Sequence, residues 1–370
     1  MMRKRFRARF LCWLVPTGLT FGGLAAALTA LVEYNSSPTR PVAWRPTPEL
    51  APWSSHFSPN NALANPTRFE CKGNGPESIA INPINGDLAA GFNDGSIHLI
   101  ADGTDSRIIG NTRGIPLGLG FLPDSSIVVA DALRGLLHVD KHGKVTTLST
   151  ASDGIPLMYA DGLVVDASGD NVYFTDLNTR RRPGPDLLEI IEHVGTGRLL
   201  RYNTETKRTT TLMTGLQAAN GVALGPEDAY ILVNETGAYR VRQYWLTGPK
   251  AGQSKVFADG LPGLPDNITF NGRDKFWIAI PAPRSHLLDG LAGAPEVRRL
   301  LTRFLVNHIM PSPPISKVVA LDLSGNPVAI LEGRGPNIYA PITEAHEAGS
   351  RLILGSADAP CLASISRPRP

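Results

Sequence analysis

Acid and amide side chains stand at the same place in successive copies of a repeated pattern in this chain. Each is flanked by Gly or Pro and opens a short apolar alternation, and together they are Glu77, Asp161, Asn220, Asp266 and Asn267. Carboxylate and amide oxygens, with no Cys or His among them, are the donors that a hard cation such as Ca2+ prefers over Zn2+. The competing interpretation is that these residues only form turns, as Asp and Asn beside Gly often do.

The pattern itself predicts the fold. Each copy continues through a turn into a run rich in β-branched and aromatic residues, which is typical of antiparallel strands joined by tight turns. Copies begin near Pro76, Pro116, Ala160, Gly215, Gly260 and Tyr339. A period of roughly 40 to 50 residues with about four strands per copy is the signature of a propeller. We therefore expect an all-β protein with a six-bladed β-propeller; a β-sandwich or barrel is the alternative.

A propeller would bring the polar residues together. The first strand of every blade lines the central channel, so residues that open the repeats project toward one point on the axis. Three carboxylates there would repel each other strongly unless a cation were bound. This arrangement predicts a Ca2+ site formed by all five residues. Asp266 is the first candidate for a catalytic carboxylate, Glu77 or Asp161 can replace it, and His346, in the opening strand of the last copy, is expected near the channel mouth.

The N-terminal part differs from the rest. Residues 1–9 are basic, and the 23 positions from Phe10 to Val32 carry no charge, which is long enough to cross a bilayer. The pattern predicts a cytoplasmic segment (1–9), a transmembrane signal anchor (10–32), an extended linker (33–65) and a propeller (66–367) outside the cytoplasm, in a periplasm, a lumen or the cell exterior. A cleaved signal peptide is the alternative. The net charge of +3 gives no basic footprint for nucleic acid.

Cysteine positions predict a disulfide. Cys71 precedes the first repeat and Cys361 lies in the last one, and the two ends of a closed ring meet. A bond between them would lock the ring, and a compartment outside the cytoplasm permits it. Two unrelated buried thiols are the alternative. Cys12 lies inside the apolar segment.

Two segments do not resemble strands. They are residues 180–196 and residues 283–314, and we place the second between blades 5 and 6. The second has apolar residues at helical spacing, with Arg298, Arg299 and Arg303 between them, which predicts an amphipathic helix. Such insertions commonly wall a binding site on one face. The helix is expected to shape an apolar pocket, to rest on the membrane, or simply to pack on a blade edge.

Several stretches resemble one known family. They are GPESIA, RGIPLGLGF with VVADALRGLLHVD, VYFTDLNTR, GRLLRYN, GLQAANGVAL, QYWLTGPKAGQSKVFADGLPGLPDNI and RLILGS. The chain from about Gly75 to Ser364 is similar to the strictosidine synthase-like family, in particular to members akin to adipocyte plasma membrane-associated protein. The wider clan includes paraoxonases, gluconolactonases and diisopropyl fluorophosphatase. The resemblance implies a six-bladed propeller whose axial Ca2+ polarises the oxygen of lactones, aryl esters or organophosphates.

The same resemblance assigns site residues and shows departures. Glu77, Asn220, Asp266 and Asn267 match the clan's calcium ligands, whereas Asp161 stands where relatives usually carry Asn. Paraoxonases place two histidines where this chain has Leu117 and a residue near Ala132, so a histidine proton relay is not expected. The glutamate of true strictosidine synthases falls near Thr343 or Glu344.

These features lead to one expected function and two alternatives. We expect a calcium-dependent hydrolase of a small ester, lactone or similar apolar substrate, held at a membrane by its N-terminal helix. The first alternative is a membrane-tethered binding propeller in which Ca2+ is structural. The second is a synthase that condenses an amine with an aldehyde.

Overall fold

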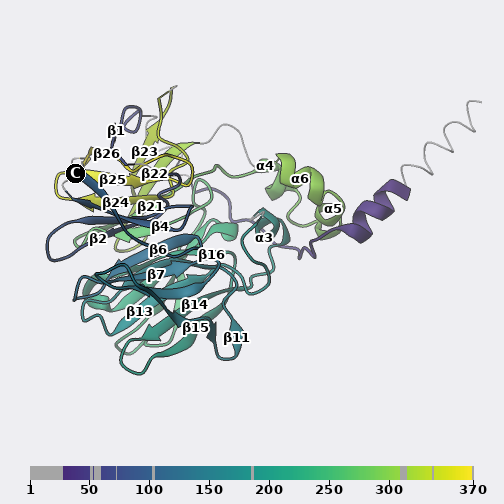
Figure 1. Ribbon diagram of the computed structural model, residues 1–370. Coiled ribbons are helices and arrows are strands. Elements are labelled where there is room, and N and C mark those ends of the chain that lie inside the picture. Colours follow the sequence, from purple (N-terminus) through teal and green to yellow (C-terminus); the bar gives the residue numbers. More distant parts are fainter. Residues whose placement is uncertain are drawn as a thin grey trace, which may run out of the picture.

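The computed structural model describes residues 28–50, 53, 60–71, 73–101, 105–184, 187–308, 315–335 and 337–368. Within these residues the chain forms six four-stranded antiparallel sheets, which confirms the predicted six-bladed propeller. Figure 1 shows the sheets on one side and a group of short helices on the other. A small hairpin, β10 (Ala151–Ser152) and β11 (Ile155–Pro156), stands outside the six sheets.

The sheets follow the chain in order, and each begins with its innermost strand. Blade 1 is β2 (Ile79–Ile81), β3 (Leu88–Gly91), β4 (Ser96–Ala101) and β5 (Asp105–Asn111). Blade 2 is β6 (Pro116–Phe121), β7 (Ile127–Asp131), β8 (Gly135–Val139) and β9 (Val145–Ser149). Blade 3 is β12 (Ala160–Val165), β13 (Asn171–Asp176), β14 (Gly197–Asn203) and β15 (Arg208–Leu216).

The second half repeats this order. Blade 4 is β16 (Ala219–Leu224), β17 (Tyr230–Glu235), β18 (Arg240–Trp245) and β19 (Ser254–Ala258), with two short turns of 3-10 helix, η1 (Pro226–Asp228) and η2 (Thr236–Ala238). Blade 5 is β20 (Ile268–Phe270), β21 (Lys275–Ala279), β22 (Ser316–Asp322) and β23 (Pro327–Gly333). Blade 6 is β24 (Glu344–Ala348), β25 (Arg351–Gly355), β26 (Ala363–Ser366) and, as its outer strand, β1 (Thr67–Arg68) from the start of the propeller.

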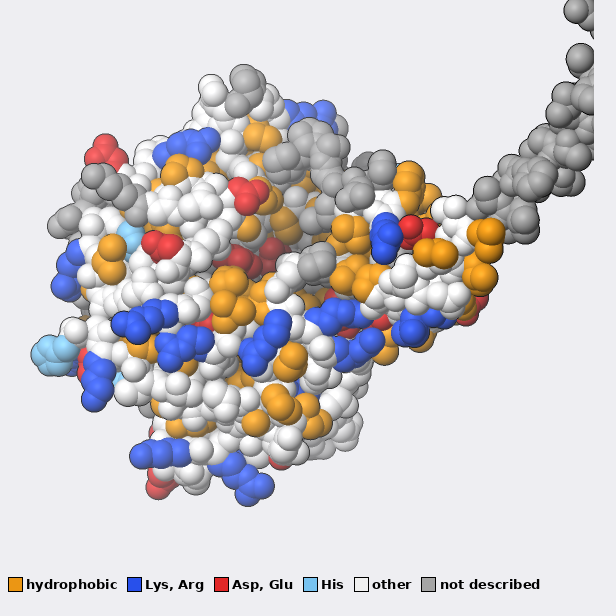
Figure 2. All heavy atoms as spheres, turned by 45° about the vertical axis from the view of Figure 1, so that its right-hand side comes forward, with side chains coloured by type: hydrophobic (Ala, Val, Ile, Leu, Met, Phe, Trp, Pro, Cys, Tyr) orange, Lys and Arg blue, Asp and Glu red, His pale blue; other side chains and the backbone are white. Residues whose placement is uncertain are grey.

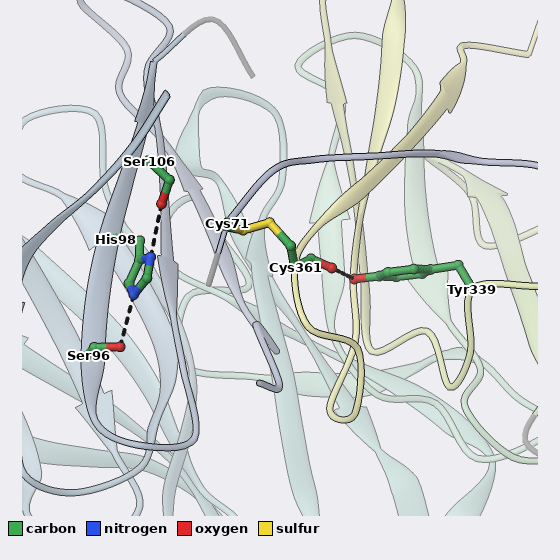
Figure 3. The surroundings of a disulfide bond; sticks show 6 residues. All are labelled: Cys71, Ser96, His98, Ser106, Tyr339 and Cys361. Carbon is green, nitrogen blue, oxygen red and sulfur yellow. Dashed lines mark hydrogen bonds between the residues drawn. A yellow bond between two sulfur atoms is a disulfide. The ribbon is translucent and has the colours of Figure 1, made fainter. Parts of the chain in front are cut away.

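The ring is closed by both backbone pairing and a covalent bond. Strand β1 pairs with β26, so the last sheet contains both ends of the propeller. The predicted disulfide is confirmed: Cys71 and Cys361 are bonded, with their Cα atoms 5.4 Å apart (Figure 3). The hydroxyl of Tyr339 donates a 2.9 Å hydrogen bond to the carbonyl of Cys361 beside this bond.

The core lies between the sheets. Six clusters of buried apolar side chains each join two neighbouring blades, and the cluster between blades 4 and 5 extends under the helices. Strands that alternate between the two faces of their sheet supply these side chains, as expected for sheets covered on both sides. This packing fixes the relative positions of the inner strands.

The helical segments correct one prediction. Helices α4 (His286–Gly290), α5 (Pro295–Leu300) and α6 (Thr302–His308) lie between β21 and β22, and α3 (Leu187–Glu192) lies between β13 and β14. The larger insertion therefore interrupts blade 5 and does not lie between blades 5 and 6. The repeat pattern located only the first two strands of that blade, because the insertion separates them from the other two. We call α3 to α6 the cap.

The predicted amphipathic face is also wrong in part. Leu305 is fully buried, but so is Arg298, whereas Val297 and Phe304 are largely exposed. The Arg298 guanidinium donates hydrogen bonds to the carbonyls of Ile191, Val42 and Ala292. Satisfying three buried carbonyls outweighs the usual preference of an arginine for water.

The N-terminal residues reach the cap. A helix covers residues 28–36, and the chain that follows runs along the cap, where the amide of Val42 donates to the carbonyl of Glu192 and that of Trp44 to Ala292. None of the helices in the described residues is long and apolar enough to cross a membrane. Most of the predicted anchor, residues 10–27, lies outside the described residues.

Candidate active site

The inner strands begin around a cavity of about 470 Å3 on the side of the ring that carries the cap. The cavity brings together four of the five residues expected to bind a metal, namely Glu77, Asp161, Asn220 and Asp266. Asn267 is buried next to Asp266 but does not line the cavity. Figure 2 looks onto this face and shows acidic side chains in a hollow bordered by hydrophobic ones.

Irregular strand register positions two of these side chains. On β12 the pairing with β13 shifts between Ala160 and Leu163, and on β16 the pairing with β17 shifts between Ala219 and Val222. A bulge bends its strand and redirects a side chain. The equivalent bulges in two blades thus place the residue after the first strand position, Asp161 or Asn220, at the channel mouth.

The glycine that follows each of these residues allows neighbouring strands to approach. A methyl group on Gly162 would lie 2.7 Å from the Cα of Gly221, and one on Gly221 would lie 2.5 Å from the Cα of Asn267. Real Cβ atoms do not come so close to backbone atoms, so only glycine fits. The Asp-Gly and Asn-Gly pairs in the sequence therefore reflect crowding at the axis as well as turn formation.

Hydrogen bonds between blades hold the backbone of the site. The hydroxyl of Thr175 donates to the carbonyl of Asn220 at 2.7 Å, and the side-chain amide of Asn234 donates to the carbonyl of Asp266 at 2.5 Å. Thr175 and Asn234 are both fully buried. Because these bonds use the main-chain oxygens, the side-chain oxygens of Asn220 and Asp266 remain directed to the cavity.

The cavity is electronegative. Its charged lining residues are Glu77, Asp161, Asp266 and Asp358, and no Lys, Arg or His belongs to the described lining. Asp161 and Asp266 are only 2% and 7% exposed. Buried carboxylates that line one cavity without a basic neighbour favour a bound cation or a proton. Asp358, in the loop after β25, was not expected from the sequence, because it opens no repeat.

We tested whether this set of residues fits a metal ion. Among the described residues, no three His, Cys, Asp or Glu side chains are placed to hold one ion. Amide oxygens add to the carboxylates, however: the side-chain oxygen of Asn220 is buried and has no hydrogen-bond partner within the described part of the chain. A buried acceptor without a donor indicates a missing partner. The mixed set of carboxylate and amide oxygens fits Ca2+.

One wall of the cavity is apolar. Leu117 and Ala132, at the positions compared above with the paraoxonase histidines, are both buried in a small cluster with Tyr159, Leu177 and Ala218. The last three also line the cavity. The second blade therefore contributes packing at the channel mouth, and no titratable group comes from these two positions.

Both insertions contribute to the wall. Ile190 comes from α3, and Pro281 to Pro283 lead from β21 toward α4. Residues outside the repeat pattern therefore form part of the cavity wall, as expected for insertions on one face. At the end of α3, the buried carboxylate of Glu192 forms ion pairs with Arg180 and Arg181, each with an N–O distance of 2.7 Å.

His346 does not belong to this cavity. It lines a separate cavity of about 660 Å3, together with Glu344 and the later residues of the inner strands, such as Phe121 and Phe270. Burial lowers the pKa of His346 to about 4. Thr343, just before β24, lines the mouth, whereas Glu344 and His346 on β24 point to the same side of the strand and line the other cavity.

Glu344 is a buried carboxyl beside the site. Its oxygen accepts a 2.6 Å hydrogen bond from the amide of Ile79. Burial, together with the negative charge of Asp266, raises the pKa of Glu344 to about 8 despite that hydrogen bond. Glu344 is therefore mostly protonated at neutral pH.

Comparison with known proteins places the chain in a family. Residues 161–249 match the family model described as strictosidine synthase, and residues 56–99 match the one described as strictosidine synthase-like, N-terminal. The chain is 32% identical to adipocyte plasma membrane-associated protein of Gallus gallus over 94% of this chain and 90% of that protein. The chain belongs to the strictosidine synthase-like family. A second member, strictosidine synthase-like protein 3 of Arabidopsis thaliana, is 32% identical over 78% of this chain and 81% of its own length.

Solved structures share the fold of this strictosidine synthase-like protein. A gluconolactonase of Xanthomonas campestris superposes with a TM-score of 0.59 at 15% identity, covering 83% of this chain and 97% of the gluconolactonase. A calcium-binding regucalcin of Agrobacterium tumefaciens gives the same TM-score and identity over 84% of this chain and 95% of the regucalcin. At this identity the likeness shows the fold alone.

Proposed function

We propose that this protein is a calcium-dependent hydrolase of esters or lactones. The observation that supports it best is the cavity that four carboxylates and the unpartnered oxygen of Asn220 line together, without a basic side chain in the described lining. Glu77, Asp161, Asn220 and Asp266 would hold Ca2+, with Asn267 beside them. Bound there, Ca2+ would supply Lewis-acid chemistry by polarising the substrate carbonyl.

Asp266 is the proposed proton acceptor. Its main chain is held on both sides, since its amide donates to the carbonyl of Ala279 at 3.0 Å and its carbonyl accepts from Asn234. A carboxylate on a rigid backbone can accept a proton from an attacking water, or attack the electrophile itself, without a costly rearrangement. Glu77, which is half-buried across the cavity, is the second candidate.

The remaining wall would select the substrate. Leu177, Ile190, Leu264 and Pro281 form an apolar surface beside the carboxylates. Such a surface binds the hydrocarbon part of an ester or lactone and keeps bulk water from the reacting carbonyl. The cavity volume of about 470 Å3 is in the range of small-molecule sites.

Turnover of phenyl acetate and of a γ-lactone, with Ca2+ and after chelation, tests the proposal. We expect turnover that requires Ca2+, that Asp266→Ala removes, and that the exposed control Asn85→Ala retains. Turnover that persists in chelator, or that Asp266→Ala leaves intact, would contradict the assignment. A rise in melting temperature with Ca2+ reports binding independently of activity.

A binding propeller with structural Ca2+ is the second candidate. It is favoured by the apolar contribution of Leu117 and Ala132, which leaves the second blade without a proton-transfer group at those positions. Stabilisation by Ca2+ without turnover of any ester or lactone would select it. An amine-condensing synthase gains no support, because Glu344 lines the other cavity and only Thr343 of that pair faces this one.

We further propose that the propeller is held at a membrane, outside the cytoplasm, by one N-terminal span. The described end of that segment, the helix over 28–36, exposes Leu28, Leu31 and Val32. Relatives carry the name plasma membrane-associated protein. Retention of the full chain in membranes after an alkaline wash, with an uncleaved N-terminus by sequencing, is the expected result; release of a shortened chain would indicate a cleaved signal peptide.

A further inference from the structure

A third cavity, of about 270 Å3, lies between the N-terminal linker and the propeller. We call it the linker cavity. It is separate from the cavity that Glu77, Asp161 and Asp266 line, with which it shares no lining residue. Its lining residues are Val42, Ala43, Trp44, Arg45, Thr47, His193, Val194, Gln217, Ala238 and Arg240.

Two polar ring nitrogens in this wall are buried and have no hydrogen-bond partner among the described residues. They are the indole Nε1 of Trp44 and the imidazole Nδ1 of His193. The two rings are stacked, with centroids 3.8 Å apart and an interplanar angle of 21°. His193 is only 6% exposed and has a positive φ of 57°, so the backbone holds it in a costly conformation. Buried polar atoms of this kind normally have a partner, and these two border a cavity.

The charges around the linker cavity are mainly positive. Arg45 and Arg240 line it, and the described lining includes no Asp or Glu. Arg240 shares its charge with Glu235, which accepts from its Nε at 2.5 Å and its Nη2 at 3.0 Å. The buried Arg298 approaches from the cap side, where its guanidinium donates to the backbone carbonyls of Ile191, Val42 and Ala292. Burial, followed by the charges of Arg298 and Arg240, lowers the pKa of His193 to about 3.

We propose that the linker cavity binds a small anion that carries a carboxylate or a phosphate. The indole N–H of Trp44 is a donor only, the exposed Arg45 brings a guanidinium to the rim, and the side-chain amide of Gln217 adds a further donor. Charge-assisted hydrogen bonds from such donors hold carboxylate and phosphate oxygens well. The volume equals that of about nine water molecules, which admits a small anion.

Binding there would join two parts of the chain. Trp44 and Arg45 belong to the linker, whereas His193, Gln217 and Arg240 belong to blades 3 and 4 and the cap. An anion between them would hold the linker against the cap and so strengthen the attachment already made by the amides of Val42 and Trp44. The ligand is thus expected to protect the linker from proteases and from amide exchange.

Titration of the full chain with inorganic phosphate and with acetate, followed by calorimetry and by the fluorescence of Trp44, tests the proposal. We expect saturable binding, weakened about tenfold by Arg45→Glu and by Trp44→Phe, which keeps the stacked ring but removes the N–H. The control Arg208→Glu makes the same charge change on the exposed edge of β15 and should bind as the wild type does. Melting temperatures establish that each variant is folded.

The outcomes separate clearly. Equal binding by all variants, or no binding of either anion at millimolar concentration, would overturn the proposal. Reconstitution in phosphatidylcholine vesicles with and without phosphatidic acid identifies the source of the anion. If the wild type loses phosphate binding only in vesicles that contain phosphatidic acid, the lipid headgroup occupies the site. If phosphate binding is the same in both kinds of vesicle, the ligand is a soluble anion.

Discussion

A methyl group on Gly221 would lie 2.5 Å from the Cα of Asn267, so the inner strands of blades 4 and 5 are in backbone contact beside the proposed calcium ligands. All three atoms nearest to that methyl group are backbone atoms of residues 266–268, which cannot move without displacing Asp266. We expect Gly221→Ala to lower the free energy of unfolding by about 1–3 kcal/mol and to weaken Ca2+ binding. Gly290→Ala, with no atom near its methyl group, is the control and should change stability by less than about 1 kcal/mol. Equal effects of the two substitutions on calorimetric Ca2+ affinity would argue against this role of the contact.

Asp161→Asn should separate metal affinity from turnover. Asp161 is almost fully buried at the cavity and adds a negative charge beside the place where an oxyanion would form. Removal of that charge should weaken Ca2+ binding while raising kcat by up to about tenfold, because the bound metal becomes a stronger Lewis acid. Steady-state kinetics at saturating Ca2+ measure this. A fall in kcat to the level of Asp266→Ala would instead assign Asp161 the role of proton acceptor.

The disulfide should account for a large share of stability. It closes a loop with a sequence separation of 290 residues, for which the chain-entropy model gives about 6 kcal/mol. Denaturant unfolding of Cys361→Ser and of the double variant with Cys71→Ser should show the same loss, because one bond is removed in both. A larger loss in the double variant would show that Cys71 contributes packing of its own.

Glu344 predicts a pH dependence of stability. Its pKa is raised to about 8 in the folded protein, so between about pH 4.5 and 8 the folded state binds more protons than the unfolded one and stability falls as pH rises. His346 acts in the opposite direction below its ordinary pKa of 6.5, which leaves pH 6.5 to 8 as the clear window. In chelator, Glu344→Gln should flatten the decline in melting temperature across that window, and the exposed control Glu205→Gln should not. An unchanged slope in Glu344→Gln would mean that another group titrates there.

The hydrogen bonds of Arg298 within the cap and to the linker predict that the cap can loosen separately from the propeller. Leucine at this position cannot satisfy the carbonyls of Ile191, Val42 and Ala292. We expect Arg298→Leu to reduce the exchange protection of the Val42 and Trp44 amides at least about tenfold, while amides in β21 and β22 keep theirs. Equal loss of protection in the cap and in blade 5 would show that the two unfold together. Arg299→Leu is not a matched control, because Arg299 is half-buried and its guanidinium carbon lies 3.9 Å from the ring centroid of Tyr34. The exposed Arg208→Leu serves instead.

The repeated strand pattern was enough to predict the six blades, the disulfide and the cavity. Short strands with strict turn residues repeat because each blade must present the same faces to its neighbours, and the polar start of each copy recurs at equivalent positions. Asp161, Asn220 and Asp266 were found in this way, and the glycines that follow Asp161 and Asn220 carried the additional information about crowding. Asp358 carries no such signal, because it follows a strand in a loop.

Residues outside the repeats were harder to predict. The helical spacing predicts that Arg298 lies on the polar, exposed face of its helix. It is buried because α3 and the linker supply carbonyls that accept from it, and the spacing of residues within the helix carries no information about those distant segments. The place of the larger insertion within blade 5 was missed for a similar reason, since β22 is separated from β21 by more than 30 residues. His346 was assigned to the wrong cavity, because the lining changes between Thr343, which borders the cavity at the channel mouth, and Glu344, which borders the other cavity together with His346.

The pairing of β1 with β26 also sets the order of events during synthesis. Thr67 is made nearly 300 residues before its partner Ser364, which at about 5–20 residues per second means a wait on the order of 15–60 s. Throughout that time β26 does not exist, so β1 has no strand to pair with. The bond between Cys71 and Cys361 can form only after this delay, so the ring is closed by the strand that is made first and the strand that is made last.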